Sequence, residues 1–262
     1  MSKDAFFVGY LPTPPAIRSS NRLIACLLFT WLAVAGLTVA AFQTDSGPST
    51  WNAEIVETQG TFRCIEGVPF LEVTRSGTVD GVLLVRPGKF ALPEAYCGPP
   101  VAQTTNPGGL DLPVSEFEDQ SVVVRGTVLS RNSHQMIEVM AINPMADSSA
   151  PESQPAYPRS PIRVRGEVVD SKCYLGAMKP GTGPVHRSCA ALCLAGGIPA
   201  GLVTAGTPEE FRVLANAPFN GARWVGDSVE VNGELVRIGS LGIIILPSDQ
   251  LSQVLPGYRE AR

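Results

Sequence analysis

A repeated block of short strands constrains the fold of this chain more than any other feature. The block Ser121-Val-Val-Val-Arg-Gly126-Thr-Val aligns with Ser228-Val-Glu-Val-Asn-Gly233-Glu-Leu, and each copy precedes a turn and an apolar strand. A glycine partway along a long strand permits the tight coiling of a small closed barrel. The sequence therefore predicts a mainly β protein with two tandem OB-like β-barrels.

Apolar runs and period-two alternation predict about five strands in each barrel. His134 follows a hairpin turn and is expected to be solvated, whereas Met136 and Met140 are expected in the strand core. A Pro- and Gly-rich loop is predicted at 93–113. The predicted strands are 53–57, 67–73, 79–85, 120–130 and 134–142 in the first barrel, and 162–170, 201–205, 211–215, 228–237 and 242–246 in the second.

Residues 23–42 carry no charge and are long enough to cross a bilayer as a helix. Lys3, Arg18 and Arg22 precede this run, so the positive-inside rule predicts a single-pass inner-membrane anchor. Its N-terminus would be cytoplasmic and the bulk of the chain periplasmic. The alternative is a signal peptide cleaved near Ala41. The length of the run and the long aromatic tail before it favour the anchor; residues 6–12 of that tail would lie in the headgroup layer or dock on a membrane partner.

The part of the chain after the apolar run is acidic. From Gln43 onward it has 17 Lys and Arg and 23 Asp and Glu, which gives a net charge of −6. An acidic exported region lacks the positive surface charge that binds nucleic acid, so a protein or a small ligand is the predicted partner.

Composition divides the chain into seven predicted segments. They are a cytoplasmic tail at 1–22, a transmembrane helix at 23–42, a linker at 43–52, the first barrel at 53–143, a Pro-rich linker at 144–161, the second barrel at 162–250 and a C-terminal tail at 251–262.

Three cysteines and a histidine gather in one short stretch of the second barrel. Pro184 favours the start of a short helix, and the Gly196-Gly197 pair favours its end. On that helix His186, Cys189 and Cys193 are spaced i, i+3 and i+7, which puts them on one face. Cys173 returns to them across a Gly- and Pro-rich loop. We therefore expect the chemistry of the protein at these four residues.

Three interpretations of this cluster stay open. The four residues could form a Cys₃His metal site, which suits zinc or copper. Alternatively, Cys173 bridges one of the other two cysteines and leaves a lone thiol beside His186. A third interpretation is burial alone, because this spacing is also that of a helix packed on a barrel. The chain has no Cys-x-x-Cys, P-loop, His-Glu-x-x-His or Gly-x-Ser-x-Gly motif, and we therefore expect a non-enzymatic protein.

The remaining cysteines favour one disulfide. Cys26 falls in the apolar run, and five cysteines remain in the exported part, where the environment is oxidising. Cys64 and Cys97 both belong to the first barrel and are predicted to pair. In the chain-entropy model such a disulfide stabilises the fold by roughly 3–4 kcal/mol.

The second barrel, at about 163–246, resembles a widespread bacterial family of exported or membrane-anchored proteins. The family motif is matched by Gly166-Glu-Val-Val-Asp170-Ser-Lys-Cys173, by His186-Arg-Ser-Cys189-Ala-Ala-Leu-Cys193 and by Gly197-Ile-Pro199. The tail at 6–12 is also similar to the start of such proteins. The resemblance implies an OB-like fold and the four-residue cluster, without a particular activity.

The anchor, the acidic exported region and the cluster together suggest a function. We expect a periplasmic accessory subunit of a membrane redox or respiratory assembly, whose Cys₃His site holds a metal or stabilises the fold. The alternative is an independent periplasmic protein that handles a metal or exchanges thiols and disulfides.

Overall fold

The computed structural model describes residues 15–42, 48–90, 92, 97, 117–145, 156–207, 210–216, 224–247 and 255–256. The chain divides into two compact units, Met1–Asp45 and Ser46–Arg262. Several predicted segments lie outside the described residues: the aromatic tail at 6–12, most of the loop at 93–113, most of the Pro-rich linker and nearly all of the C-terminal tail.

The described residues of the first unit form one long helix, α1 (Pro15–Phe42). It begins earlier than the predicted residue 23, because Pro15 is well suited to the first helical turn and the residues after it continue the helix. Residues Ile17–Ala41 have a mean hydropathy of 2.3 and none of them is buried. Within the described part of the chain, this is the one helix that is long and apolar enough to cross a membrane. A signal sequence has the same properties.

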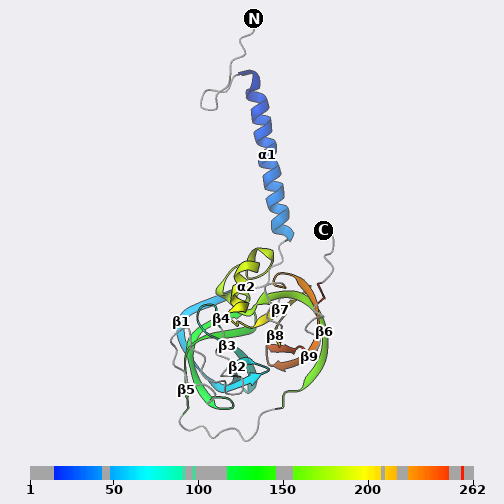
Figure 1. Cartoon of the computed structure of the whole chain (residues 1–262). Helices are drawn as coiled ribbons and strands as arrows, with labels where there is room; N and C mark the ends of the chain where they lie inside the picture. The colour runs from blue at the N-terminus through cyan, green and yellow to red at the C-terminus, as the bar shows by residue number, and fades with distance from the viewer. Residues whose placement is uncertain are drawn as a thin grey trace. The chain divides into compact units, whose positions relative to one another are not determined.

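The second unit begins with a closed five-stranded barrel, and its strands follow the ring order β1-β2-β3-β5-β4 (Figure 1). All neighbours in the ring are antiparallel except β3 and β5, which are parallel. The strands are β1 (Ser49–Ile65), β2 (Val68–Arg75), β3 (Thr78–Val85), β4 (Ser121–Arg131) and β5 (His134–Pro144).

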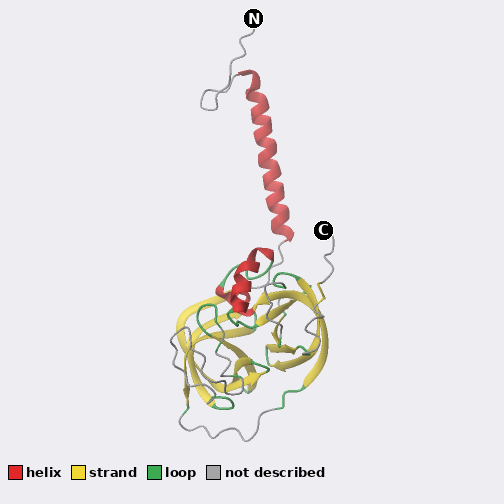
Figure 2. Cartoon of the chain, in the orientation of Figure 1, coloured by secondary structure: helices red, strands yellow, loops and turns green. Residues whose placement is uncertain are grey.

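The second barrel repeats this topology strand for strand. Its ring order is β6-β7-β8-β10-β9, with β8 and β10 as the parallel pair, and the short β11 (Leu255–Pro256) adds to β9. The prediction of two OB-like barrels is therefore confirmed (Figure 2). The strands are β6 (Arg159–Asp170), β7 (Ala200–Thr204), β8 (Phe211–Ala215), β9 (Ser228–Ile238) and β10 (Leu241–Ile245).

The repeated glycines lie where two backbones approach closely. A Cβ added at Gly126 would lie 2.1 Å from the carbonyl oxygen of Glu138 on β5. At the matching Gly233, the added Cβ would lie 2.5 Å from the carbonyl oxygen of Ile245 on β10. Both barrels therefore need a residue without a side chain at this point of the strand that is fourth in chain order, β4 or β9.

The two barrels share a core in addition to the core inside each of them. Along β3, Val82 and Leu84 pack inside the first barrel, while Leu83 and Val85 face the second. On the other side of this junction lie residues of β8 and β10, among them Phe211, Val213 and Ile243. Strands buried on both faces read as continuous apolar runs, which explains the lack of alternation in these segments.

Two residue-level predictions were wrong. His134 is half-buried at the junction, where its ring meets that of Phe211 edge-on with centroids 5.5 Å apart. Met140 is 39% exposed, because it is the extra residue of a β-bulge: Arg125 pairs with Ala141 and Gly126 with Val139, so Met140 has no partner on β4. Met136 is fully buried, as predicted.

Candidate metal centre at the junction of the barrels

The insertion between β6 and β7 carries the candidate site. It starts with a π-helical turn, η2 (Cys173–Ala177), and continues through a 3₁₀ turn, η3 (Pro184–His186), into α2 (Arg187–Ala195). Pro184 opens the helical segment, and Gly197, with a φ of 87°, follows its end. This is the short helix that the sequence predicts.

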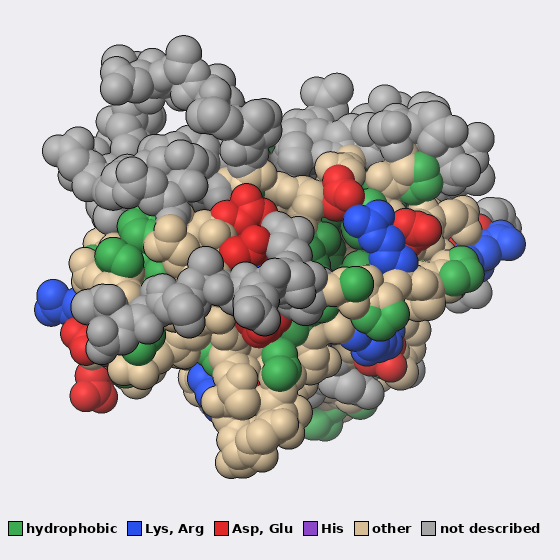
Figure 3. Space-filling model, turned by 90° about the horizontal axis from the view of Figure 1, so that it is seen from below, with side chains coloured by type: hydrophobic (Ala, Val, Ile, Leu, Met, Phe, Trp, Pro, Cys, Tyr) green, Lys and Arg blue, Asp and Glu red, His purple; other side chains and the backbone are tan. Residues whose placement is uncertain are grey.

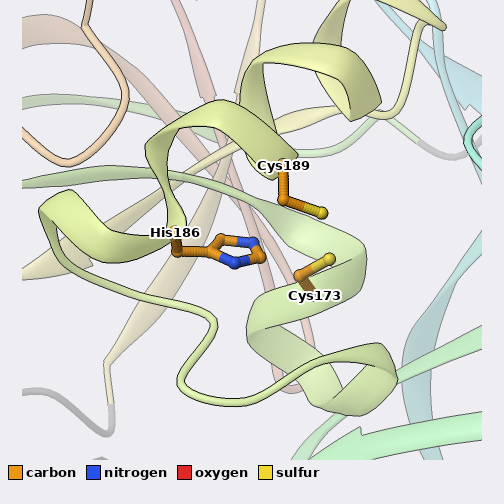
Figure 4. A group of neighbouring side chains, drawn as sticks. All are labelled: Cys173, His186 and Cys189. Atoms are coloured by element: carbon orange, nitrogen blue, oxygen red, sulfur yellow. The ribbon is translucent and has the colours of Figure 1, made fainter.

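Three side chains of the insertion converge on one point. The ligand atoms of Cys173, His186 and Cys189 all lie within 4.8 Å of one another. Figure 4 shows the two sulfurs and the imidazole directed toward each other, with Cys173 on one helical segment and the other two on the next. Cys173 and His186 are buried, whereas Cys189 is half-buried. The site is thus closed on its inner side and reachable from its outer side.

A second group of three potential metal ligands lies deeper in the protein and also includes Cys173. The ligand atoms of Asp170, Cys173 and Cys193 also lie within 4.8 Å of one another, and all three residues are buried. The Cys173 backbone N–H donates to Asp170 Oδ1 over 2.8 Å. The other carboxylate oxygen, Oδ2, lies 3.0 Å from His186 Nε2. A carboxylate only accepts hydrogen bonds, so this contact puts the proton of a neutral ring on Nε2 and the lone pair on Nδ1.

Local charges favour one thiolate in the deeper group. A hydrogen bond between the two sulfurs, together with burial, raises the pKa of Cys173 well above its ordinary value. The same hydrogen bond lowers the pKa of Cys193, and the charges of Lys89 and Lys172 lower it further. Cys193 is therefore the sulfur that accepts the hydrogen bond of the Cys173 thiol in the metal-free protein.

The first barrel approaches the insertion closely, and one lysine from each side makes a contact between them. Lys89 Nζ lies 3.6 Å from Cys189 Sγ. A Cβ added at Gly196 would lie 1.8 Å from the carbonyl oxygen of Lys89, so only glycine allows α2 to end here. The buried Lys172 reaches across the junction to Glu138 Oε1, 2.5 Å from its Nζ, and donates to the carbonyl of Arg86 over 2.9 Å.

The structure thus brings all four predicted cluster residues together, as two groups that meet at Cys173. The Cys64–Cys97 disulfide that the sequence predicts is present. Sequence reasoning missed Asp170, although it lies three residues before Cys173, and it missed Lys89 and Met178. The Met178 sulfur lies 3.2 Å from Cys189 Sγ. Its signal was weak, because an isolated methionine in a loop has no periodic pattern around it.

A separate cavity next to the disulfide is less suited to a ligand. It is lined by charged residues that already have partners: Arg63 pairs with Asp119, and Arg159 pairs with Glu66 at 3.4 Å. The face shown in Figure 3 likewise mixes acidic and basic side chains among the described residues, without one dominant sign. The Cys/His groups are therefore the stronger candidate.

Comparison with protein-family models, with curated proteins and with solved structures yields no match for this chain. The fold and the candidate site therefore rest on the residues and contacts described above.

Proposed function

We propose that this protein binds one metal ion, through Cys173, His186 and Cys189, on the outer side of a membrane. The single observation that carries the proposal is the convergence of three soft or borderline donor atoms within 4.8 Å of one another. Two thiolates and an imidazole are donors that zinc and copper accept. Three protein ligands leave one coordination position for a further ligand.

The surroundings of the three donors support this proposal. Asp170 is fully buried and contacts the His186 ring, as carboxylates do when they orient a metal-binding histidine. The Lys89 ammonium lies 3.6 Å from Cys189 Sγ and would place a positive charge beside a metal-bound sulfur. Burial of Cys173 and His186 keeps water from competing for the metal on the inner side.

The test is a metal-binding measurement on the full-length, reduced protein in detergent under anaerobic conditions. We expect one Co²⁺ per chain, with a sulfur-to-metal charge-transfer band in the near ultraviolet, and displacement of Co²⁺ by Zn²⁺. A Cys64→Ala/Cys97→Ala variant should retain the band, because those sulfurs belong to the disulfide. A protein that keeps no metal after desalting would contradict the proposal.

Thiol exchange is a second candidate, favoured by the hydrogen-bonded sulfurs of Cys173 and Cys193. An oxidised thiol partner would accept two electrons and two protons as these thiols join in a disulfide. Thiol titration of the protein as isolated, in denaturant and chelator, separates the candidates. The metal proposal expects four titratable thiols, those of Cys26, Cys173, Cys189 and Cys193. Two titratable thiols would favour the exchange reaction.

We further propose that α1 stays in the inner membrane and that the protein serves as a periplasmic subunit of a membrane redox assembly. The uncharged, exposed surface of residues 23–41 supports an anchor. In a mild detergent, the native protein should migrate with a larger membrane complex on a native gel. Migration of the native protein alone, or recovery of a shortened chain in the soluble fraction, would contradict this assignment.

A further inference from the structure

We infer that the metal is Cu(I) and that the Met178 thioether is its outermost ligand. This inference rests on the proposed metal function and adds a ligand and a metal to it. Met178 Sδ lies 3.2 Å from Cys189 Sγ, so the thioether already touches one of the three donors. Thioether sulfur is a soft ligand that suits Cu(I), whereas Zn²⁺ in proteins takes thiolate, imidazole and carboxylate.

The backbone holds Met178 in this position. η2 ends at Ala177, and the next residue, Met178, is extended, with a φ of −149° and a ψ of 147°. Cys173 and Met178 therefore stand at the two ends of one short turn, while His186 and Cys189 come from η3 and α2. The four side chains approach the site from two segments of the insertion, which supplies three sulfurs and one nitrogen.

Exposure decreases from the outside of the site to the inside. Met178 is 49% exposed, Cys189 is half-buried, and His186 and Cys173 are 5% and 4% exposed. Met178 is therefore not part of the buried core. Its place instead suits first contact with an incoming ion, which then passes to the thiolates inside.

The charge of the site also favours a monovalent ion. Cu(I) with two thiolates carries a net charge of −1, and the Lys89 ammonium lies 3.6 Å from Cys189 Sγ to offset it. Zn²⁺ with the same two thiolates is neutral, so the ammonium is attracted less strongly to that group than to the Cu(I) group. The position of Lys89 thus agrees with the thioether in favouring Cu(I).

The experiment compares Cu(I) and Zn²⁺ affinities of the full-length protein in detergent, by competition with a chromophoric chelator for each ion. For Met178→Leu we expect a loss of Cu(I) affinity of about 10–100-fold, the range for removal of a supporting group, with no change for Zn²⁺. The control is Met140→Leu, an exposed methionine of β5 outside the donor groups, which should leave both affinities unchanged. Circular dichroism checks that each variant is folded.

The remaining outcomes overturn the inference in distinguishable ways. Unchanged Cu(I) affinity in Met178→Leu would remove Met178 from the ligand set. Equal losses for both ions would show a structural role for Met178 rather than selection of copper. Tight Zn²⁺ binding without measurable Cu(I) binding would overturn the copper assignment but leave the proposed metal function intact. Failure of the wild-type protein to bind Cu(I), Zn²⁺ and Co²⁺ would end both.

Discussion

Replacing Lys172 by methionine should lower the free energy of unfolding by about 3–5 kcal/mol, the cost of breaking a buried ion pair by removing one partner. The lysine and Glu138 are both buried, and 2.5 Å separates Nζ from Oε1. Methionine fills a similar volume but, among the residues that the structure describes, leaves the Glu138 carboxylate with Thr127 Oγ1 alone, which donates to its Oε2 over 2.8 Å. Urea denaturation of the full-length protein in detergent measures the change.

A matched control uses an exposed ion pair of the same kind. Arg163 pairs with Glu230 at 2.5 Å, but 71% of the arginine side chain is exposed. Arg163→Met should therefore cost at most about 1 kcal/mol. Adding Glu138→Gln to Lys172→Met should recover part of the loss, because the unpaired charge is then gone. Equal costs for Lys172→Met and Arg163→Met would show that the contact across the junction contributes little.

Cys173→Ser should abolish metal binding, because this sulfur is the one that both donor groups share. Among the other cysteines, Cys189→Ser should weaken binding by about 10–100-fold or more. Cys193→Ser should weaken binding less, because Cys193 belongs to the deeper group. That group also depends on Asp170, whose two oxygens already contact the Cys173 N–H and the His186 ring. Co²⁺ titration of each variant, followed by the charge-transfer band, measures the order.

The order of the three variants locates the ion. A larger loss in Cys193→Ser than in Cys189→Ser would move the metal to the deeper group of Asp170, Cys173 and Cys193. Retention of the charge-transfer band in Cys173→Ser would contradict both positions. Serine is close to cysteine in size, so thermal unfolding of the metal-free variants serves as the control for folding.

Local patterns predicted much of the fold. Strands β3, β4, β8 and β10 follow from β-branched and aliphatic runs bounded by turns, and the structure places them within one or two residues of the prediction. β1 was predicted far too short, because most of its 17 residues are polar or exposed and show no clear alternation. Its pairing with β4 from Ser49 to Thr61 supplies the missing signal, and that pairing is a tertiary contact.

The candidate site, like the fold, could be predicted where the local sequence carries the signal and not where a tertiary contact does. Helical spacing was enough to bring His186, Cys189 and Cys193 to one side of a helix, and a cysteine just before a loop was enough to suggest Cys173. Lys89 could not be predicted, since it belongs to the other barrel and reaches Cys189 only because Gly196 admits its backbone. The family resemblance remains a prediction.

The core shared by the two barrels has a consequence for the way this chain can be divided. Leu83 and Val85 of one barrel and Phe211 and Val213 of the other are buried against this common surface. If the two barrels were separated, each would expose an apolar surface to water and would be prone to aggregation or self-association. The chain therefore resembles a covalently linked dimer of two similar barrels. Its candidate metal ligands lie at the interface that both barrels need in order to bury their apolar surfaces.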